Sequence, residues 1–320
     1  MYFKKLIHPE FFQGNKKKNN YFEGWYYKFV SYDELTTIAL IPGVSINKED
    51  KHAFIQVFIS KMINNKVELK TFYFRFTIDD FSFNHEVFTV TIGDNVFTKS
   101  EIKINLVNNE IDLKGRISIS EITPIKSSLL VPNIMGFFGY FNFMECYHGV
   151  ISMSHSLKGA LYLNKTSINF DKGKGYIEKD WGKSFPKSYV WLQSNHFSNS
   201  STSLMFSYAT IPFIGLSFKG LIANLVYQGK EYRFATYNSA KIQYVNISDN
   251  LVEYTLKKRQ YKLTIKAMSH HQIDLASPRN GKMIEHIKEG LSGTIDLSFY
   301  INNHLVYEDT GKHAGIEIMM

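Results

Sequence analysis

The sequence alternates apolar and polar residues with a period of two in one segment after another, and this pattern constrains the fold most. Successive side chains of a β-strand point to opposite faces, so a strand that buries one face shows this alternation. Helical periodicity is hard to find anywhere in the chain. We therefore predict an all-β protein of antiparallel strands with little helix, and the clearest expected strands cover 53–59, 72–76, 102–106, 261–267 and 295–301.

The expected strands fall into two series of similar length. The 320 residues suit two domains better than one. Prolines and glycines break the rhythm over 124–143, which we interpret as a crossover between domains or a lid over a cavity. We predict one β-barrel domain over 1–155 and a second over 156–320 that carries an acidic motif. A short echo, an acidic residue before tryptophan near Glu23 and again near Glu178, favours two barrels of like fold.

Composition excludes several classes of protein. Cys146 is the single cysteine, so neither an intrachain disulfide framework nor a cysteine-rich zinc site is possible. The net charge is +8, with basic clusters at 16–18 and 257–259, but no nucleic-acid-binding module accompanies them. We interpret these clusters as solvated loops, and weak attraction to an anionic membrane surface stays open as an alternative. We expect no nucleic-acid partner.

Targeting signals give a similar expectation. The start of the chain lacks the apolar core of a signal peptide, and no apolar run reaches the roughly 18 residues of a transmembrane helix. The expected location is cytoplasmic, with membrane association open.

The acidic motif lies near the middle of the chain. On one strand Glu178 and Asp180 would share a face, about 6–7 Å apart, with Lys179 on the other face. Two close carboxylates disfavour double ionisation, and the neighbouring indole of Trp181 adds desolvation, so one carboxyl is expected to stay protonated near neutral pH. The alternative is an ion-paired strand end before a Gly-Pro turn.

Other reactive side chains give weaker patterns. His148 and His155 are seven residues apart, so they would point to opposite faces of one strand, and we expect no metal site. His148 is a candidate base or orienting residue near the acidic motif. Cys146 is a disfavoured nucleophile. We expect Glu23 to pair with Lys28 or another base, and a second acid is the alternative.

Taken together, these motifs resemble the tocopherol cyclase family. The resemblance spreads over nearly the whole chain. It rests on 23–26, 145–149, 176–182 and 184–186, on Trp191, Gln193 and Asn195, and on 314–317.

The resemblance implies two lipocalin-like β-barrels and a reaction that adds a phenol hydroxyl across a prenyl double bond to close a chromanol ring. Such an enzyme, an intramolecular lyase or isomerase, needs no cofactor, and its partner is a hydrophobic small molecule. Plant enzymes of that family commonly have asparagine where this chain has Asp180, so the resemblance implies Glu178 as the acid and Asp180 as a tuning or orienting residue. Aromatic residues would line the substrate and two amides would bind its head group. These residues are Trp25, Trp181, Phe185 and Trp191, with Gln193 and Asn195.

Two alternatives share the apolar pocket. A lipocalin-like carrier would hold the same ligand without chemistry, and an isoprenoid hydratase would deliver water in place of the phenol. The sequence leaves the oligomeric state open.

Overall fold

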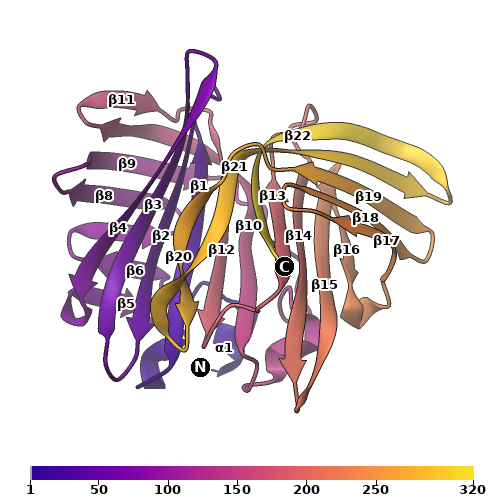
Figure 1. The fold of residues 1–320 in the computed structure, drawn as a ribbon, viewed down its shortest axis with the longest axis horizontal. Helices are drawn as coiled ribbons and strands as arrows, with labels where there is room; N and C mark the ends of the chain where they lie inside the picture. The colour runs from indigo at the N-terminus through magenta and orange to yellow at the C-terminus, as the bar shows by residue number, and fades with distance from the viewer. Residues whose placement is uncertain (1) are drawn as a thin grey trace. The chain divides into compact units, whose positions relative to one another are not determined.

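Strands make up most of the structure, a computed structural model that describes residues 2–320, with side chains from Lys4 onward (Figure 1). The chain divides into two units. Unit 1 comprises the residues up to Phe185 together with Ala276–His286. Unit 2 comprises Pro186–Leu275 and Ile287–Met320. The predicted all-β fold with antiparallel sheets is confirmed.

Unit 1 contains a 12-stranded antiparallel sheet in the order β4-β3-β2-β1-β12-β10-β9-β8-β7-β6-β5, with β11 paired to β10. Short helices precede and interrupt it: α1 (Tyr2–Ile7), η1 (Gly14–Lys16), η2 (Ile78–Asp80) and η3 (Gly136–Tyr140). The strands are β1 (Tyr21–Val30), β2 (Thr36–Ile46), β3 (Lys51–Ile63), β4 (Lys66–Thr77), β5 (Phe81–Asn84), β6 (Thr89–Ile92), β7 (Asn95–Thr98), β8 (Glu101–Val107), β9 (Asp112–Ser120), β10 (Cys146–Leu163), β11 (Thr166–Asn169) and β12 (Lys174–Gly182).

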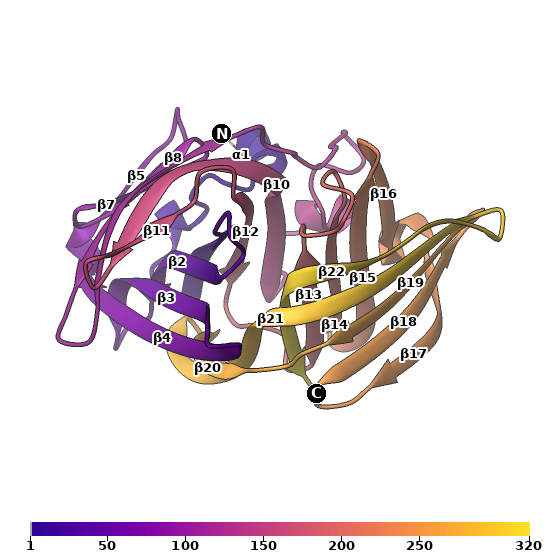
Figure 2. The same cartoon turned by 90° about the horizontal axis from the view of Figure 1, so that it is seen from above.

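The sheet of unit 1 is rolled up, although its pairings form an open path. Its two end strands, β4 and β5, follow each other in the chain with only η2 between them. The ends of the sheet therefore lie close together. In Figure 2, β2–β4 lie on one side of the unit and β8 and β10 on the other. The buried core between them draws on both groups of strands, for example Val57 of β3 and Ile104 of β8.

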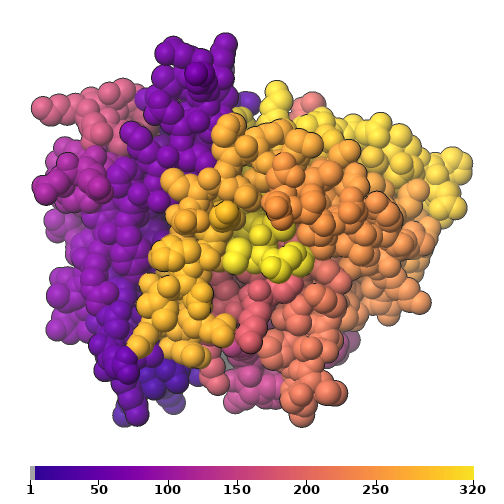
Figure 3. Space-filling view, in the orientation of Figure 1, coloured from indigo at the N-terminus to yellow at the C-terminus, as the bar shows by residue number. Residues whose placement is uncertain are grey.

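A hairpin tip from late in the chain completes unit 1. Residues 276–286 belong to the amber atoms that lie against the purple atoms of unit 1 in Figure 3. Gln56 of β3 fixes the tip with two hydrogen bonds, because its Nε2 donates to the carbonyl of Ala276 at 3.0 Å and its Oε1 accepts from the Ala276 N–H at 3.1 Å.

Unit 2 repeats the arrangement with a 10-stranded sheet in the order β16-β15-β14-β13-β22-β21-β19-β18-β17, with β20 paired to β21. Its end strands β16 and β17 are also consecutive, joined through η4 (Thr236–Asn238). The strands are β13 (Tyr189–Ser194), β14 (Ser203–Phe213), β15 (Leu216–Tyr227), β16 (Lys230–Ala235), β17 (Lys241–Ile247), β18 (Leu251–Lys258), β19 (Tyr261–Met268), β20 (Ile273–Arg279), β21 (Lys282–Ile301) and β22 (His304–Met319).

The two units share one topology, because in each the first strand pairs with a last strand that returns to it. Their boundary differs from the one drawn at residue 155, which falls inside the unbroken strand β10. The acidic motif, expected in the C-terminal domain, forms β12 and closes the sheet of unit 1. The segment 124–143 contains η3 and no strand, as predicted, and it belongs to unit 1.

Candidate functional site

Strand β12 carries the acidic motif and presents two chemically different faces. Glu178 and Asp180 share one face, since both lie within reach of the same histidine, and Lys179 points to the other face into the core of unit 1. The predicted alternation is therefore confirmed. It follows from the pleat of the strand, which places every second side chain on the same side.

His148 joins the two carboxylates from the neighbouring strand β10. The antiparallel register sets His148 directly opposite Asp180. Its Nδ1 is 2.9 Å from Oδ1 of Asp180, and its Nε2 is 3.5 Å from Oε2 of Glu178. The hydroxyl of Tyr176, two residues before Glu178, donates a hydrogen bond to Glu178 as well. We call these four side chains the acid cluster.

The charges of the acid cluster favour a protonated imidazole. Burial alone would lower the pKa of His148, but the charges of Asp180 and Glu178 and the hydrogen bond to Asp180 outweigh it and raise that pKa to about 9. The cluster is accessible, since the side chains of His148 and Asp180 are 15% and 25% exposed. The sequence predicts a proton on one of the two carboxyls, and this stays a prediction. The imidazole of His148 is a second site in the cluster that can carry a proton.

The side chains of His148, Glu178 and Asp180 also form a group that could hold a metal ion, since one ligand atom from each lies within 4.8 Å of the others. In the present arrangement, however, each ring nitrogen of His148 faces a different carboxylate. Binding a metal needs a neutral imidazole with a free nitrogen directed at the ion. The expected absence of a metal site therefore stays a prediction.

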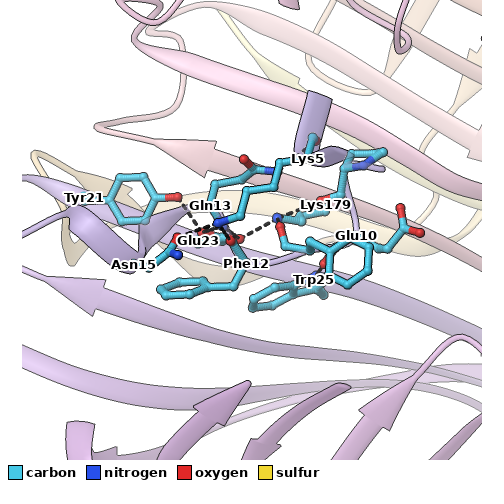
Figure 4. Close-up of polar contacts among 11 residues, drawn as sticks. Lys5, Glu10, Phe12, Gln13, Asn15, Tyr21, Glu23, Trp25 and Lys179 are labelled. Atoms are coloured by element: carbon cyan, nitrogen blue, oxygen red, sulfur yellow. Dashed lines mark hydrogen bonds and ion pairs between the residues drawn. The ribbon is translucent and has the colours of Figure 1, made fainter. Parts of the chain in front are cut away.

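The opposite face of β12 contributes to a buried polar cluster around Glu23 (Figure 4). Lys179 forms an ion pair with Glu23, and both side chains are fully buried. The backbone N–H of Gln13 donates to both carboxylate oxygens of Glu23, at 2.8 and 2.9 Å, and the hydroxyl of Tyr21 donates to one of them. Glu23 therefore has the structural role that we expected, with Lys179 as the base.

Lys179 is held from three sides. Its Nζ donates to the carbonyl oxygens of Pro9 and Phe11, each at 2.7 Å, and it lies 4.8 Å from the ring centres of Trp25 and Trp181. Burial lowers the pKa of Lys179 to about 8, although the charge of Glu23 opposes that shift. These contacts fix the N-terminal segment to the inner side of β12.

A cavity of about 720 Å³ opens beside this segment in unit 1. Trp181 forms part of its wall and stacks on Tyr147 at 5.4 Å between ring centres. The acid cluster is not among the residues that line this cavity in the described part of the chain. The lining residues are Lys5, Leu6, Gln13, Asn15, Lys16, Lys17, Asn19, Asn20, Tyr21, Asn133, Gly139, Phe141, Asn142, Phe143, Met144, Tyr147, Trp181, Gly182 and Lys183.

The remaining expected substrate residues have different surroundings. Trp25 is buried in the core of unit 1, where its indole N–H donates to the carbonyl of Glu10 at 2.8 Å. Phe185 packs edge-on against Phe22 at 5.4 Å between ring centres. Their substrate contacts stay predictions.

Trp191, Gln193 and Asn195 belong to unit 2. The first two lie in β13 and Asn195 follows directly after it. All three are buried, and Asn195 accepts a hydrogen bond at 2.9 Å from His196 Nδ1. The predicted binding of a head group by the two amides is not tested by these contacts.

The pKa shifts of the other two candidates, His155 and Cys146, make both poorly suited to chemistry near neutral pH. His155 is on the core side of β10, as the spacing predicts, and burial lowers its pKa to about 3. Burial raises the pKa of the Cys146 thiol well above its usual value, and the charge of Asp180 adds to this shift. A thiol with a raised pKa is a poor nucleophile.

Two features around β12 were not predicted from the sequence. Tyr176 could have been found, because it is two residues from Glu178 on the same strand and must share its face. The Glu23–Lys179 pair depends on the register of β1 with β12, in which Trp25 lies opposite Lys179. That register is not encoded by any local pattern.

The sequence model of the tocopherol cyclase-like family matches residues 130–319. This range covers more than half of the chain and includes the whole acid cluster. The chain belongs to the tocopherol cyclase-like family. The segment around Glu23 lies outside the matched range, so the early part of the resemblance rests on the sequence motif alone. No curated protein sequence matches the chain.

Solved structures of low sequence identity share the fold. CghA with Sch210972 has a TM-score of 0.61 at 7% identity, over 94% of this chain and 88% of that chain. An AttH-like protein of Nitrosomonas europaea has a TM-score of 0.55 at 12% identity, over 93% and 92%. Kievitone hydratase of Nectria haematococca has a TM-score of 0.53 at 12% identity, over 93% and 88%. At these identities the likeness shows the fold alone.

Proposed function

We propose that this tocopherol cyclase-like protein is an enzyme that adds a hydroxyl group across a double bond of a hydrophobic, prenylated substrate. The observation that supports this proposal most is the position of His148 between two carboxylates, with Nδ1 2.9 Å from Asp180 and Nε2 3.5 Å from Glu178. Acid–base catalysis requires a titratable group that is positioned, partly desolvated and reachable. The acid cluster meets these requirements.

Ring closure on a prenylquinol would leave the proton balance of the site unchanged. The cluster delivers one proton to an alkene carbon, and the phenol oxygen bonds to the tertiary cation that results. The phenol then returns its proton to the cluster. No electrons are exchanged with an outside group, so the product is an isomer of the substrate with a chromanol-type ring.

Within the cluster we propose Glu178 as the group that transfers the proton. His148 recharges Glu178 across the 3.5 Å separation, and Asp180 holds the imidazole through its Nδ1 at 2.9 Å. Tyr176 orients the Glu178 carboxylate from the other side. Trp25 and Trp181 contact Lys179, which points to the face of β12 opposite to Glu178, so we do not place them beside the group that Glu178 protonates. The substrate contacts expected of Phe185, Trp191, Gln193 and Asn195 stay predictions.

A hydratase is the second candidate, because the exposure of Asp180 lets water reach the cluster. The same proton delivery followed by attack of water would give an alcohol in place of a ring. Kievitone hydratase, by its name, is a hydratase, and it has this fold. The two candidates differ in product mass, since only hydration adds one water.

The test is turnover of a supplied prenylquinol, followed by mass analysis of the product. We expect wild type to form the isomer, and Glu178→Gln to lose at least about a hundredfold in rate. Asp180→Asn and His148→Gln should lose activity as well. Glu68→Gln, which changes an exposed carboxylate of β4, is the matched control and should keep the wild-type rate.

Other results would refute the assignment. A Glu178→Gln variant as active as wild type removes Glu178 from the role of donor. A further outcome is wild-type protein that converts the prenylquinol to neither an isomer nor a hydrated product. If a bound lipid can still be extracted from that protein, the result would identify a carrier.

A further inference from the structure

The segment 128–143 exposes large apolar side chains to solvent. Leu129 is 80% exposed and Leu130 82%, while Phe137 and Phe143 are 46% and 53% exposed. Single exposed apolar residues are common on protein surfaces. Several from one short segment indicate an interaction surface.

This segment is held in place from behind. Ile134 and Met135 are buried, and Asn133 donates from Nδ2 to the carbonyl of Leu6 at 3.0 Å. A Cβ atom on Gly139 would lie 2.6 Å from the same Asn133 amide, so the backbone packs closely there. The apolar side chains therefore project from an anchored segment.

Lysines lie beside one end of this segment, at Phe143. Phe143 lines the 720 Å³ cavity together with Lys16, Lys17 and Lys183, which are all exposed. Lys5 lines it as well, and no aspartate or glutamate is among the lining residues that the structure describes. Exposed apolar side chains beside lysines, with no acidic residue in the cavity lining, favour an anionic, hydrophobic partner over a neutral one.

We propose that this surface docks the protein onto an anionic membrane. Leu129, Leu130, Phe137 and Phe143 enter the boundary between head groups and acyl chains, and the lysines of 16–18 contact the acidic head groups. None of the helices in the described residues is long and apolar enough to cross a membrane. The docked protein lies on the surface of the bilayer. This proposal does not depend on the acid cluster, so an inactive variant still binds membranes.

Docking would place the mouth of the cavity against the lipid. Phe143, Lys16 and Lys17 belong both to the docking surface and to the cavity wall. A hydrophobic molecule could then pass from the bilayer into unit 1 without crossing water.

The experiment is co-flotation of the full chain with vesicles of phosphatidylcholine, alone or with phosphatidylserine at roughly one lipid in three. We expect binding to the phosphatidylserine vesicles that weakens with salt. Leu129→Ser with Leu130→Ser should lower the partition coefficient at least about tenfold, because two large apolar side chains no longer leave water. Replacing Lys16, Lys17 and Lys18 with glutamine should lower it by about fivefold for each lysine near the surface.

The matched control is Tyr32→Ser with Leu35→Ser. These residues are also exposed, and they follow β1 at the end opposite to Tyr21, which lines the cavity. This control should bind vesicles as wild type does. As a second measurement, Phe143→Trp should shift its fluorescence to the blue on phosphatidylserine vesicles and not on phosphatidylcholine alone.

Three results would overturn the proposal. The first is wild-type protein that stays in the soluble fraction with both vesicles. The second is equal binding by the Leu129, Leu130 variant and wild type. The third is wild-type protein that forms a dimer and binds no vesicles, while the Leu129, Leu130 variant is a monomer. That result would assign the surface to a second copy of the chain.

Discussion

His148 lies directly opposite Asp180 in the antiparallel pairing of β10 with β12, with 2.9 Å between Nδ1 and Oδ1. The same ring approaches Glu178 through Nε2, so one imidazole connects two carboxylates that are two residues apart. A cation between two anions explains why burial does not neutralise this histidine. The relationship also couples the protonation of His148 to the charges of both carboxylates.

Removing the charge of Asp180 should lower the pKa of His148 from about 9 toward its ordinary value of 6.5. In Asp180→Asn the amide oxygen still accepts a hydrogen bond but carries no charge that attracts the imidazolium. Burial, which lowers the pKa of His148, is then opposed by the charge of Glu178 alone. An NMR titration of the imidazole resonances measures this directly. A wild-type His148 that titrates near its ordinary pKa would contradict the charge arrangement described here.

Breaking the buried pair of Glu23 and Lys179 should strongly destabilise unit 1. Both side chains are fully buried, so Glu23→Gln leaves an uncompensated ammonium group and should cost about 3–5 kcal/mol in free energy of unfolding. Lys179→Met should cost a similar amount. The double variant should lose clearly less than the sum, because neither charge is then buried alone. Urea unfolding of the four proteins gives the coupling energy, and simple additivity would argue against the ion pair.

Gly175 should not tolerate alanine. A Cβ atom there would lie 2.1 Å from Nε2 of His155, which is buried and cannot move away freely. Gly175→Ala should cost about 1–3 kcal/mol, the usual range for overpacking, and His155→Ala in the same chain should relieve part of that cost. Gly24→Ala in β1 is the control, since its Cβ would meet only ordinary contacts at 3.7 Å and beyond. Equal melting temperatures for the two alanine variants would refute this account.

The alternation of side chains could be predicted because it is a local property. Glu178 and Asp180 share a face, and Lys179 takes the other, for reasons contained in three consecutive residues. The opposite faces of His148 and His155 are predicted in the same way. Two register shifts in β10 between these histidines each add one residue, and together they leave the relative facing of the two side chains unchanged.

Pairings between distant strands could not be predicted. The place of Asp180 opposite His148 and of Lys179 beside Glu23 depends on β12 returning to lie between β1 and β10. Many registers of these strands would bury the same apolar faces, so the hydrophobic pattern alone does not select one. The unit boundary differs from the expected one for the same reason. In the sequence the acidic motif precedes the second series of strands, whereas in the structure β12 is the last strand of the unit 1 sheet.

The charge on His148 should also appear in the pH dependence of stability. The folded protein raises the pKa of this group from 6.5 to about 9, so the folded state binds the extra proton between these values. The stabilisation is therefore fully present below the unfolded pKa of about 6.5 and is lost as the pH rises through about 9, with a size on the order of 3 kcal/mol. His148→Gln lacks this contribution at every pH. The free energy of unfolding of wild type minus that of His148→Gln should shrink between about pH 6 and about pH 10. Taking the difference cancels the titration of Lys179 and other groups common to both proteins, so a difference that does not change with pH would show that His148 gains no proton on folding.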